Sequence, residues 1–167
     1  KLLAEWSGCR NVGIRILNDL GYIPYEATLG FSEEFLKLEN NLSLHDDRCA
    51  CIRIIRGPFR PQELPEITSF GSFTTNDSLA FLARLSEAEK TDYRGQCIAS
   101  GFSSLAIVPI HYQDKILAAI HLADAEAGVR SKLGPWRVEL GNPEMPAPRV
   151  QATMEQKQDG RGRRGSE

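Results

Sequence analysis

The sequence predicts an α+β domain over residues 1–126, an antiparallel sheet flanked by helices, followed by a disordered tail over residues 127–167. Two pairs of strand-like segments lie near the two ends of the predicted domain, helix-like segments lie between them, and the periodic apolar pattern stops at the start of the tail. A chain of 167 residues with 41% hydrophobic and 25% charged residues suits one globular domain plus additional sequence.

The first strand pair is predicted between residues 9 and 29. Val12, Ile14 and Ile16 occupy every second position, which is the alternation of a strand with one buried face. A Leu20-Gly21 turn separates this strand from a second apolar segment. We therefore expect an antiparallel hairpin.

Short elements are predicted in the middle of the domain. Ser32 is a good N-cap for a helix that extends to residue 38. The short apolar run 51–55 is interpreted as a strand, and the proline-rich segment 57–72 as a long loop or lid. Ser86-Glu87-Ala88-Glu89 is a capping box, which predicts a helix from this point to about residue 100.

The most apolar segment, 104–111, is followed by a Gln113-Asp114 turn and a second apolar strand over 116–122. Both faces of this hairpin are apolar, so we expect it at the centre of the sheet. His111 and His121 lie on its two strands and are expected to be ordinary strand residues rather than ligands.

The chain lacks an apolar run near the ~20 residues of a membrane span, and no signal peptide is visible. Its cysteines, Cys9, Cys49, Cys51 and Cys97, are too scattered for a secreted disulfide scaffold, which favours a cytoplasmic location. The net charge of −2 supports neither a nucleic-acid partner nor membrane insertion. Because the chain starts within a helix-like pattern, we expect it to be a piece of a longer protein.

Three motifs occur in a characteristic order: Gly30-Phe31-Ser32-Glu33-Glu34-Phe35, then residues 103–110 (SSLAIVPI), then residues 115–122 (KILAAIHL). Together they resemble the GAF domain family, the second its "S-x-x-x-x-P-I/L" strand and the third its "G-x-L-x-L" return strand. The resemblance implies a GAF- or PAS-like fold that binds a small-molecule ligand. It also implies a homodimer and a downstream kinase or other output domain, both reached through terminal helices that are missing or shortened here.

A narrower resemblance is carried by Cys49-Ala50-Cys51, by Cys97 ahead of Gly101-Phe102-Ser103-Ser104, and by Gly71-Ser72-Phe73-Thr74-Thr75-Asn76. These motifs are similar to those of a Cys-x-Cys subgroup of GAF domains found in bacterial sensor histidine kinases. The resemblance implies a small-ligand, metal or redox sensing module of a two-component signal-transduction protein.

The candidate ligand-binding or metal site comprises Cys49, Cys51, Cys97 and His45. On a strand, the first two would share a face ~7 Å apart, which is too far for a disulfide but suits two thiolates that reach one metal or haem edge. His45 would then supply a fourth ligand. The cofactor stays open between a metal ion, an iron–sulfur cluster, haem and none. Zinc sites use Cys-x-x-Cys pairs, so thiols with no role remain an alternative.

Two further functions stay open, although no catalytic residue is assigned. The GAF-fold methionine sulfoxide reductases use cysteines, and here the Cys-x-Cys pair and Cys97 would serve as nucleophile and resolving thiol. A truncated product whose tail comes from a wrong reading frame would also explain the composition after residue 127.

Overall fold

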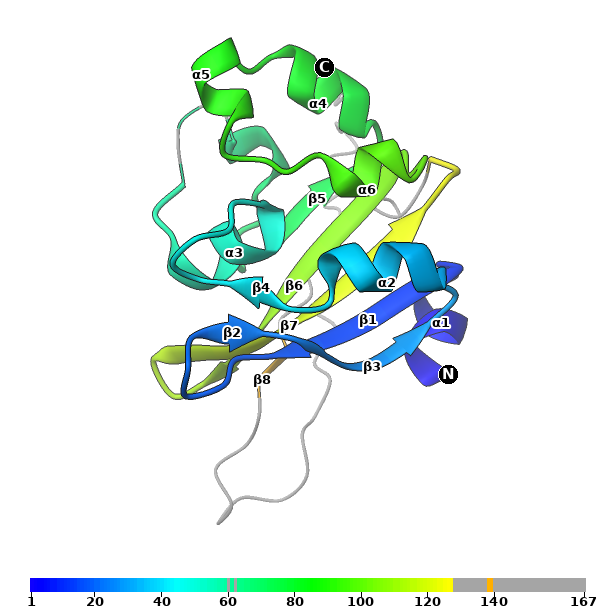
Figure 1. The fold of residues 1–167 in the computed structure, drawn as a ribbon, viewed down its shortest axis with the longest axis vertical. Coiled ribbons are helices and arrows are strands. Elements are labelled where there is room, and N and C mark those ends of the chain that lie inside the picture. The colour runs from blue at the N-terminus through cyan, green and yellow to red at the C-terminus, as the bar shows by residue number, and fades with distance from the viewer. Residues whose placement is uncertain (60, 62, 128–137, 140–167) are drawn as a thin grey trace, which may run out of the picture.

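The computed structural model describes residues 1–59, 61, 63–127, 138 and 139. Its main sheet has the strand order β3-β1-β7-β6-β5, with β8 beside β6 (Figure 1). The strands of this sheet are β1 (Asn11–Ile16), β3 (Tyr25–Leu29), β5 (Phe73–Thr75), β6 (Ser104–Tyr112), β7 (Lys115–Asp124) and β8 (Val138–Glu139). All neighbouring strands are antiparallel except β8, which is parallel to β6.

Helices and a small two-stranded sheet complete the fold (Figure 1). The helices are α1 (Leu2–Ser7), α2 (Glu33–Glu39), α3 (Ala50–Arg56), η1 (Leu64–Glu66), α4 (Ser78–Ala83), α5 (Glu87–Lys90) and α6 (Gln96–Ala99). The small sheet pairs β2 (Tyr22–Ile23) with β4 (Leu42–Ser43). The predicted fold class, an antiparallel sheet flanked by helices, is confirmed.

The sheet separates two apolar clusters. One contains Ile107 and Ala119 together with residues of α3, and the other contains Val108 and Ile120, packed against α1. Successive residues of a strand point to opposite faces, so β6 and β7 contribute to both clusters. The prediction that their hairpin is central is confirmed, because β7 pairs with both β1 and β6.

The predicted strand over 51–55 is wrong, because these residues belong to helix α3. Cys51, Ile52 and Ile54 are buried against the sheet, whereas Arg56 points to solvent. Three β-branched residues in a short apolar run favour a strand locally, and periodicity alone does not distinguish a buried strand from a buried helix. The segment forms a helix because in this form it packs its apolar side chains over the sheet.

The predicted helix from the capping box to residue 100 is interrupted. Its start is confirmed, since Ser86 and Glu89 form the capping box. However, α5 ends at Lys90, and α6 begins only after Gly95, whose positive φ of 71° breaks the helix. The intervening turn carries charged side chains toward α2 and α3.

The segment 57–72 is anchored rather than free where it is described. Glu63 is 2% exposed, and its carboxylate pairs with Arg53 of α3 and accepts a hydrogen bond from Tyr93. A buried carboxylate is stable only with such partners.

The N-cap predicted at Ser32 is confirmed, because its side chain accepts a hydrogen bond from the Phe35 amide.

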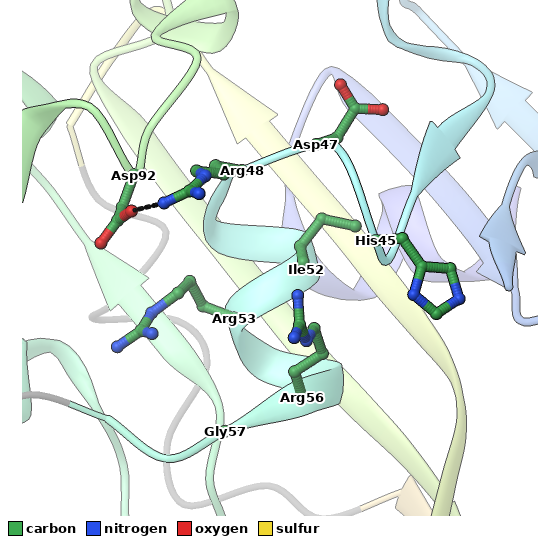
Figure 2. A pocket seen from close by; sticks show the side chains of 8 residues that line it. All are labelled: His45, Asp47, Arg48, Ile52, Arg53, Arg56, Gly57 and Asp92. Atoms are coloured by element: carbon green, nitrogen blue, oxygen red, sulfur yellow. Dashed lines mark hydrogen bonds and ion pairs between the residues drawn. The ribbon is translucent and has the colours of Figure 1, made fainter.

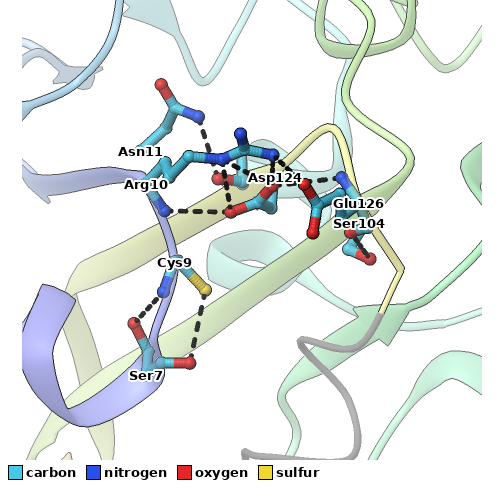
Figure 3. A network of polar contacts seen from close by, with 8 residues as sticks. Ser7, Cys9, Arg10, Asn11, Ser104, Asp124 and Glu126 are labelled. Carbon is cyan, nitrogen blue, oxygen red and sulfur yellow. Dashed lines mark hydrogen bonds and ion pairs between the residues drawn. The ribbon is translucent and has the colours of Figure 1, made fainter.

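A polar network closes the edge where β1 begins and β7 ends (Figure 3). The Asp124 carboxylate accepts hydrogen bonds from the Arg10 amide at 3.0 Å, from Arg10 Nη2 at 2.7 Å and from the Glu126 amide at 3.0 Å. These donors, chiefly the Arg10 side chain, lower the pKa of Asp124 to about 2.

The predicted disordered tail, residues 127–167, lies outside the described residues except for 127, 138 and 139. In the part of the chain that the structure describes, no helix has the length and apolar character needed to cross a membrane.

Candidate ligand-binding site

One face of β1, β3 and β7 carries polar side chains beneath the helices. Alternation along β1 places Gly13 and Arg15 on the face opposite Val12, and the register sets Gly13 beside His121. Arg15 lies opposite Tyr25 of β3. The residues that interrupt the apolar pattern of β1 therefore face the interior of the domain.

Gly13 makes room for the ring of Tyr25. A Cβ atom at this position would lie 2.4 Å from Tyr25 Cε1, which no packed structure tolerates. The absence of a side chain lets the Tyr25 hydroxyl reach Nδ1 of His121 at 2.7 Å. A glycine inside a strand here marks a close approach of another side chain.

Arg15 has no exposed surface, although its guanidinium is a cation. Nη1 donates to the Ile23 carbonyl at 2.7 Å, Nη2 donates to the Glu39 carbonyl at 2.7 Å, and the guanidinium lies 3.6 Å from the centre of the Tyr25 ring. Within the described residues, Nε has no hydrogen-bond partner and no carboxylate forms an ion pair with Arg15. A buried charge with a free donor is costly, and an anion would satisfy both.

His121 is neutral in this setting. Burial lowers its pKa to about 3, and the nearby Arg15 charge lowers it further than burial alone. Burial also raises the pKa of Tyr25, so the phenol stays protonated and shares a hydrogen bond with Nδ1. The second ring nitrogen, Nε2, lies 3.9 Å from Cys97 Sγ. Tyr25, His121 and Cys97 thus form one chain of polar contacts.

Aromatic rings enclose His121 on the helix side. Ring centres lie 5.2 Å away for Phe31 and 6.3 Å away for Phe35, and Phe102 packs edge-on against both phenylalanines. Such an apolar surrounding explains why the imidazole loses its proton so readily.

The three predicted cysteines come from two helices. Cys49 is the N-cap of α3, Cys51 lies in its first turn, and Cys97 lies on α6. The prediction that Cys49 and Cys51 share a strand face is wrong, because the segment is helical. Interaction with the Cys51 thiol, and then burial, raise the pKa of Cys49, and burial raises that of Cys97. These two thiols are therefore protonated at neutral pH.

A small cavity of about 40 Å³ joins α3, α6 and the end of α2. Cys49 and Cys97 line it together with Glu39 and Arg94. This volume holds roughly one water-sized molecule. A ligand of a few atoms fits without rearrangement, whereas a larger one requires the helices to separate.

Arg94 closes this cavity. Its Nε lies 3.0 Å from Glu39 Oε1, its Nη2 donates to the Leu38 carbonyl at 3.1 Å, and its Nη1 pairs with Asp47. Burial raises the pKa of Glu39, an effect that the Arg94 charge opposes. The turn between α5 and α6 is thereby tied to α2.

His45 does not join the cysteines. It is exposed, lies beside the Gly21 turn and lines a different cavity. In the ranges that the structure describes, no three His, Cys, Asp or Glu side chains are arranged to hold a metal ion.

Sequence reasoning missed Arg15, Tyr25 and His121 as site residues. Polar residues on strands that are expected inside a sheet could have indicated them.

The fold is shared with solved structures. A Staphylococcus aureus NreA protein, mutated in its nitrate binding site, is 14% identical, matches 80% of this chain and 89% of its own, and has a TM-score of 0.52. The fold is GAF-like. No family model and no curated protein sequence matches the chain.

Two matches have lower TM-scores and support no functional conclusion. One is the domain of a putative two-component sensor histidine kinase from Sinorhizobium meliloti, 11% identical over 76% of this chain and 68% of the other, with a TM-score of 0.49. The other is a type II free methionine-R-sulfoxide reductase from Thermoplasma acidophilum, 16% identical over 77% and 70%, with a TM-score of 0.48.

Proposed function

We propose that this chain is the ligand-binding part of a cytoplasmic sensory module in a bacterial signal-transduction protein, such as a sensor histidine kinase. Its ligand is a small anion or polar molecule held between the sheet and helices α2, α3 and α6. The observation that carries the proposal is the fully buried Arg15, whose Nε has no hydrogen-bond partner within the described residues. The nearby Glu39 carboxylate interacts with its charge but forms its ion pair with Arg94.

The interior between the sheet and the helices, here called the chamber, contains Arg15, Tyr25 and His121 next to the cavity lined by Cys49 and Cys97. Its chemistry supports an anion more than a metal ion. Among the described residues, no three His, Cys, Asp or Glu side chains are arranged to hold a metal ion. A buried guanidinium and protonated donors instead favour a negatively charged ligand. Nitrate is a suitable first probe because it is small and planar, and because the NreA protein of similar fold has a nitrate binding site.

The test is a thermal-shift titration with nitrate and nitrite against chloride at constant ionic strength. We expect nitrate or nitrite to raise the melting temperature of the wild type, and Arg15→Lys, which keeps the charge but loses the planar donors, to abolish the shift. Lys115→Gln removes an exposed cation at the β6–β7 turn, away from both cavities, and serves as the control. An undiminished shift in Arg15→Lys would contradict the assignment.

The proposal also includes a second signal, which is oxidation of the thiols that line the same chamber. Cys49 and Cys97 line one cavity, so hydrogen peroxide that enters it can oxidise both thiols to a disulfide and is itself reduced to water. The raised pKa values of both thiols make this reaction slow. Mass spectrometry of non-reduced peptides after peroxide treatment checks this, with Cys9 on the opposite side of the sheet as the internal control.

One observation favours the enzyme alternative. Cys97 Sγ lies 3.9 Å from His121 Nε2, an arrangement in which a thiol neighbours a base. Reduction of methionine sulfoxide would convert two thiols to a disulfide and release the sulfoxide oxygen as water. The raised pKa of Cys97 opposes this role. Turnover of free methionine sulfoxide with dithiothreitol, lost in Cys97→Ser, would replace the sensory proposal with the enzyme.

A further inference from the structure

A second cavity lies on the outer side of α3, away from the buried chamber (Figure 2). Its volume is about 270 Å³, close to the lower end of the range for small-molecule sites. The residues that line it are His45, Asp47, Arg48, Ile52, Arg53, Arg56, Gly57 and Asp92. Three of these eight residues are arginines and two are aspartates, so the lining has an excess of one positive charge.

Two of the arginines are held in place by acidic partners. Arg48 Nη1 lies 2.8 Å from Asp92 Oδ1, and Arg53 donates to the Glu63 carboxylate through Nε at 2.9 Å. Each of these guanidinium groups has five N–H donors, and the carboxylates use only part of them. Both side chains are therefore positioned in advance while they keep donors for a ligand.

Arg56 has no such acidic partner. Its Nη1 donates to the Leu44 carbonyl at 2.7 Å, and no described carboxylate forms an ion pair with it. The remaining acidic residue of the lining, Asp47, is engaged by Arg94. The cleft thus contains a positive charge that nothing described neutralises, on an exposed side chain fixed by one backbone contact.

We propose that this outer cleft binds a small phosphorylated compound, with Arg56 as the main contact of the phosphate and Arg48 and Arg53 as its flanking donors. The planar donor forks of arginine match phosphate oxygens in pairs. Among the described residues, the lining contains no aromatic side chain to stack on a base, so we propose a small aliphatic organic part rather than a nucleotide. This cleft shares no lining residue with the cavity beside Cys97, although the Arg94–Asp47 ion pair connects the two.

The experiment is calorimetric titration of the full chain with inorganic phosphate and with glycerophosphate, at constant ionic strength adjusted with chloride. We expect saturable binding that weakens about 10- to 100-fold in Arg56→Gln, the loss typical of a charge-assisted hydrogen bond. Lys115→Gln removes an exposed cation at the β6–β7 turn and is the matched control, with binding unchanged.

The outcomes separate the sources of the phosphate. Tighter binding of glycerophosphate supports a phosphorylated metabolite, and equal binding supports phosphate itself as the ligand. Absence of saturable binding to both, or equal weakening by Arg56→Gln and Lys115→Gln, overturns the proposal. Arg15→Lys leaves the outer cleft intact, so phosphate should still bind to this variant. Phosphate binding that persists there shows that the outer cleft works even if the nitrate experiment fails.

Discussion

Acidification should destabilise this domain through His121. The pKa of its imidazole is about 3 in the folded protein and 6.5 without the surrounding structure. Between these two values the His121 imidazole stays neutral in the folded protein but takes up a proton in the unfolded chain. The contribution of His121 to stability is therefore complete above pH 6.5 and is lost as the pH falls toward 3. The loss is about 1.4 kcal/mol per pH unit in this window, hence about 2 kcal/mol at roughly pH 5.

The assay is urea unfolding at about pH 7 and about pH 5, compared between the wild type and His121→Gln. Glutamine keeps an acceptor for the Tyr25 hydroxyl but does not titrate. The raised pKa of Glu39 changes the acid stability in the opposite direction, because the folded protein then binds a proton more readily than the unfolded chain. This effect is the same in the wild type and in His121→Gln. The wild type should therefore lose about 2 kcal/mol more than the variant.

A matched control and a direct measurement make the test decisive. His45→Gln removes an exposed imidazole and should leave the wild-type pH dependence intact. The NMR titration of the His121 ring should show no protonation between pH 7 and about 4, which also covers the case in which His121→Gln does not fold. Equal acid losses in the wild type and His121→Gln, or a ring that titrates near 6.5, would refute the reasoning.

Three further predictions concern other contacts. Asp124→Asn should lower the free energy of unfolding by about 1–3 kcal/mol in urea unfolding, because it weakens the charge-assisted hydrogen bonds at the sheet edge, whereas exposed Glu126→Gln should change it little. Gly13→Ala should cost about 1–3 kcal/mol by displacing the tyrosine ring that lies against it, and an unchanged unfolding midpoint would contradict this packing. Arg94→Ala should speed alkylation of the cavity thiols by iodoacetamide, whereas Lys90→Ala should leave the rate as it is.

Local pattern determined much of the fold. The alternation of Val12, Ile14 and Ile16, the Ser32 cap and the Ser86 capping box each involve residues within a few positions of one another, and each led to the correct element. A hairpin with two apolar faces has to lie inside a sheet, so the position of β6 and β7 also followed from sequence.

Where local signals conflicted, tertiary packing decided. The Cys51–Ile55 run has strand propensity but forms a helix because it covers the sheet. The helix predicted to reach residue 100 is divided in two: α5 ends at Lys90, α6 begins after the left-handed Gly95, and Arg94 ties the turn between them to α2. Neither constraint can be read from neighbouring residues.

The candidate site depends on distant parts of the chain. Sequence alone identified Cys49 and Cys97 as residues of interest, and the fold placed both on one cavity. The hydrogen bond between Tyr25 and His121 joins residues 96 positions apart, and it exists only because β1 lies between β3 and β7. Residue types and their alternation were set by the sequence, whereas strand order and register alone brought a tyrosine, a histidine and a buried arginine together.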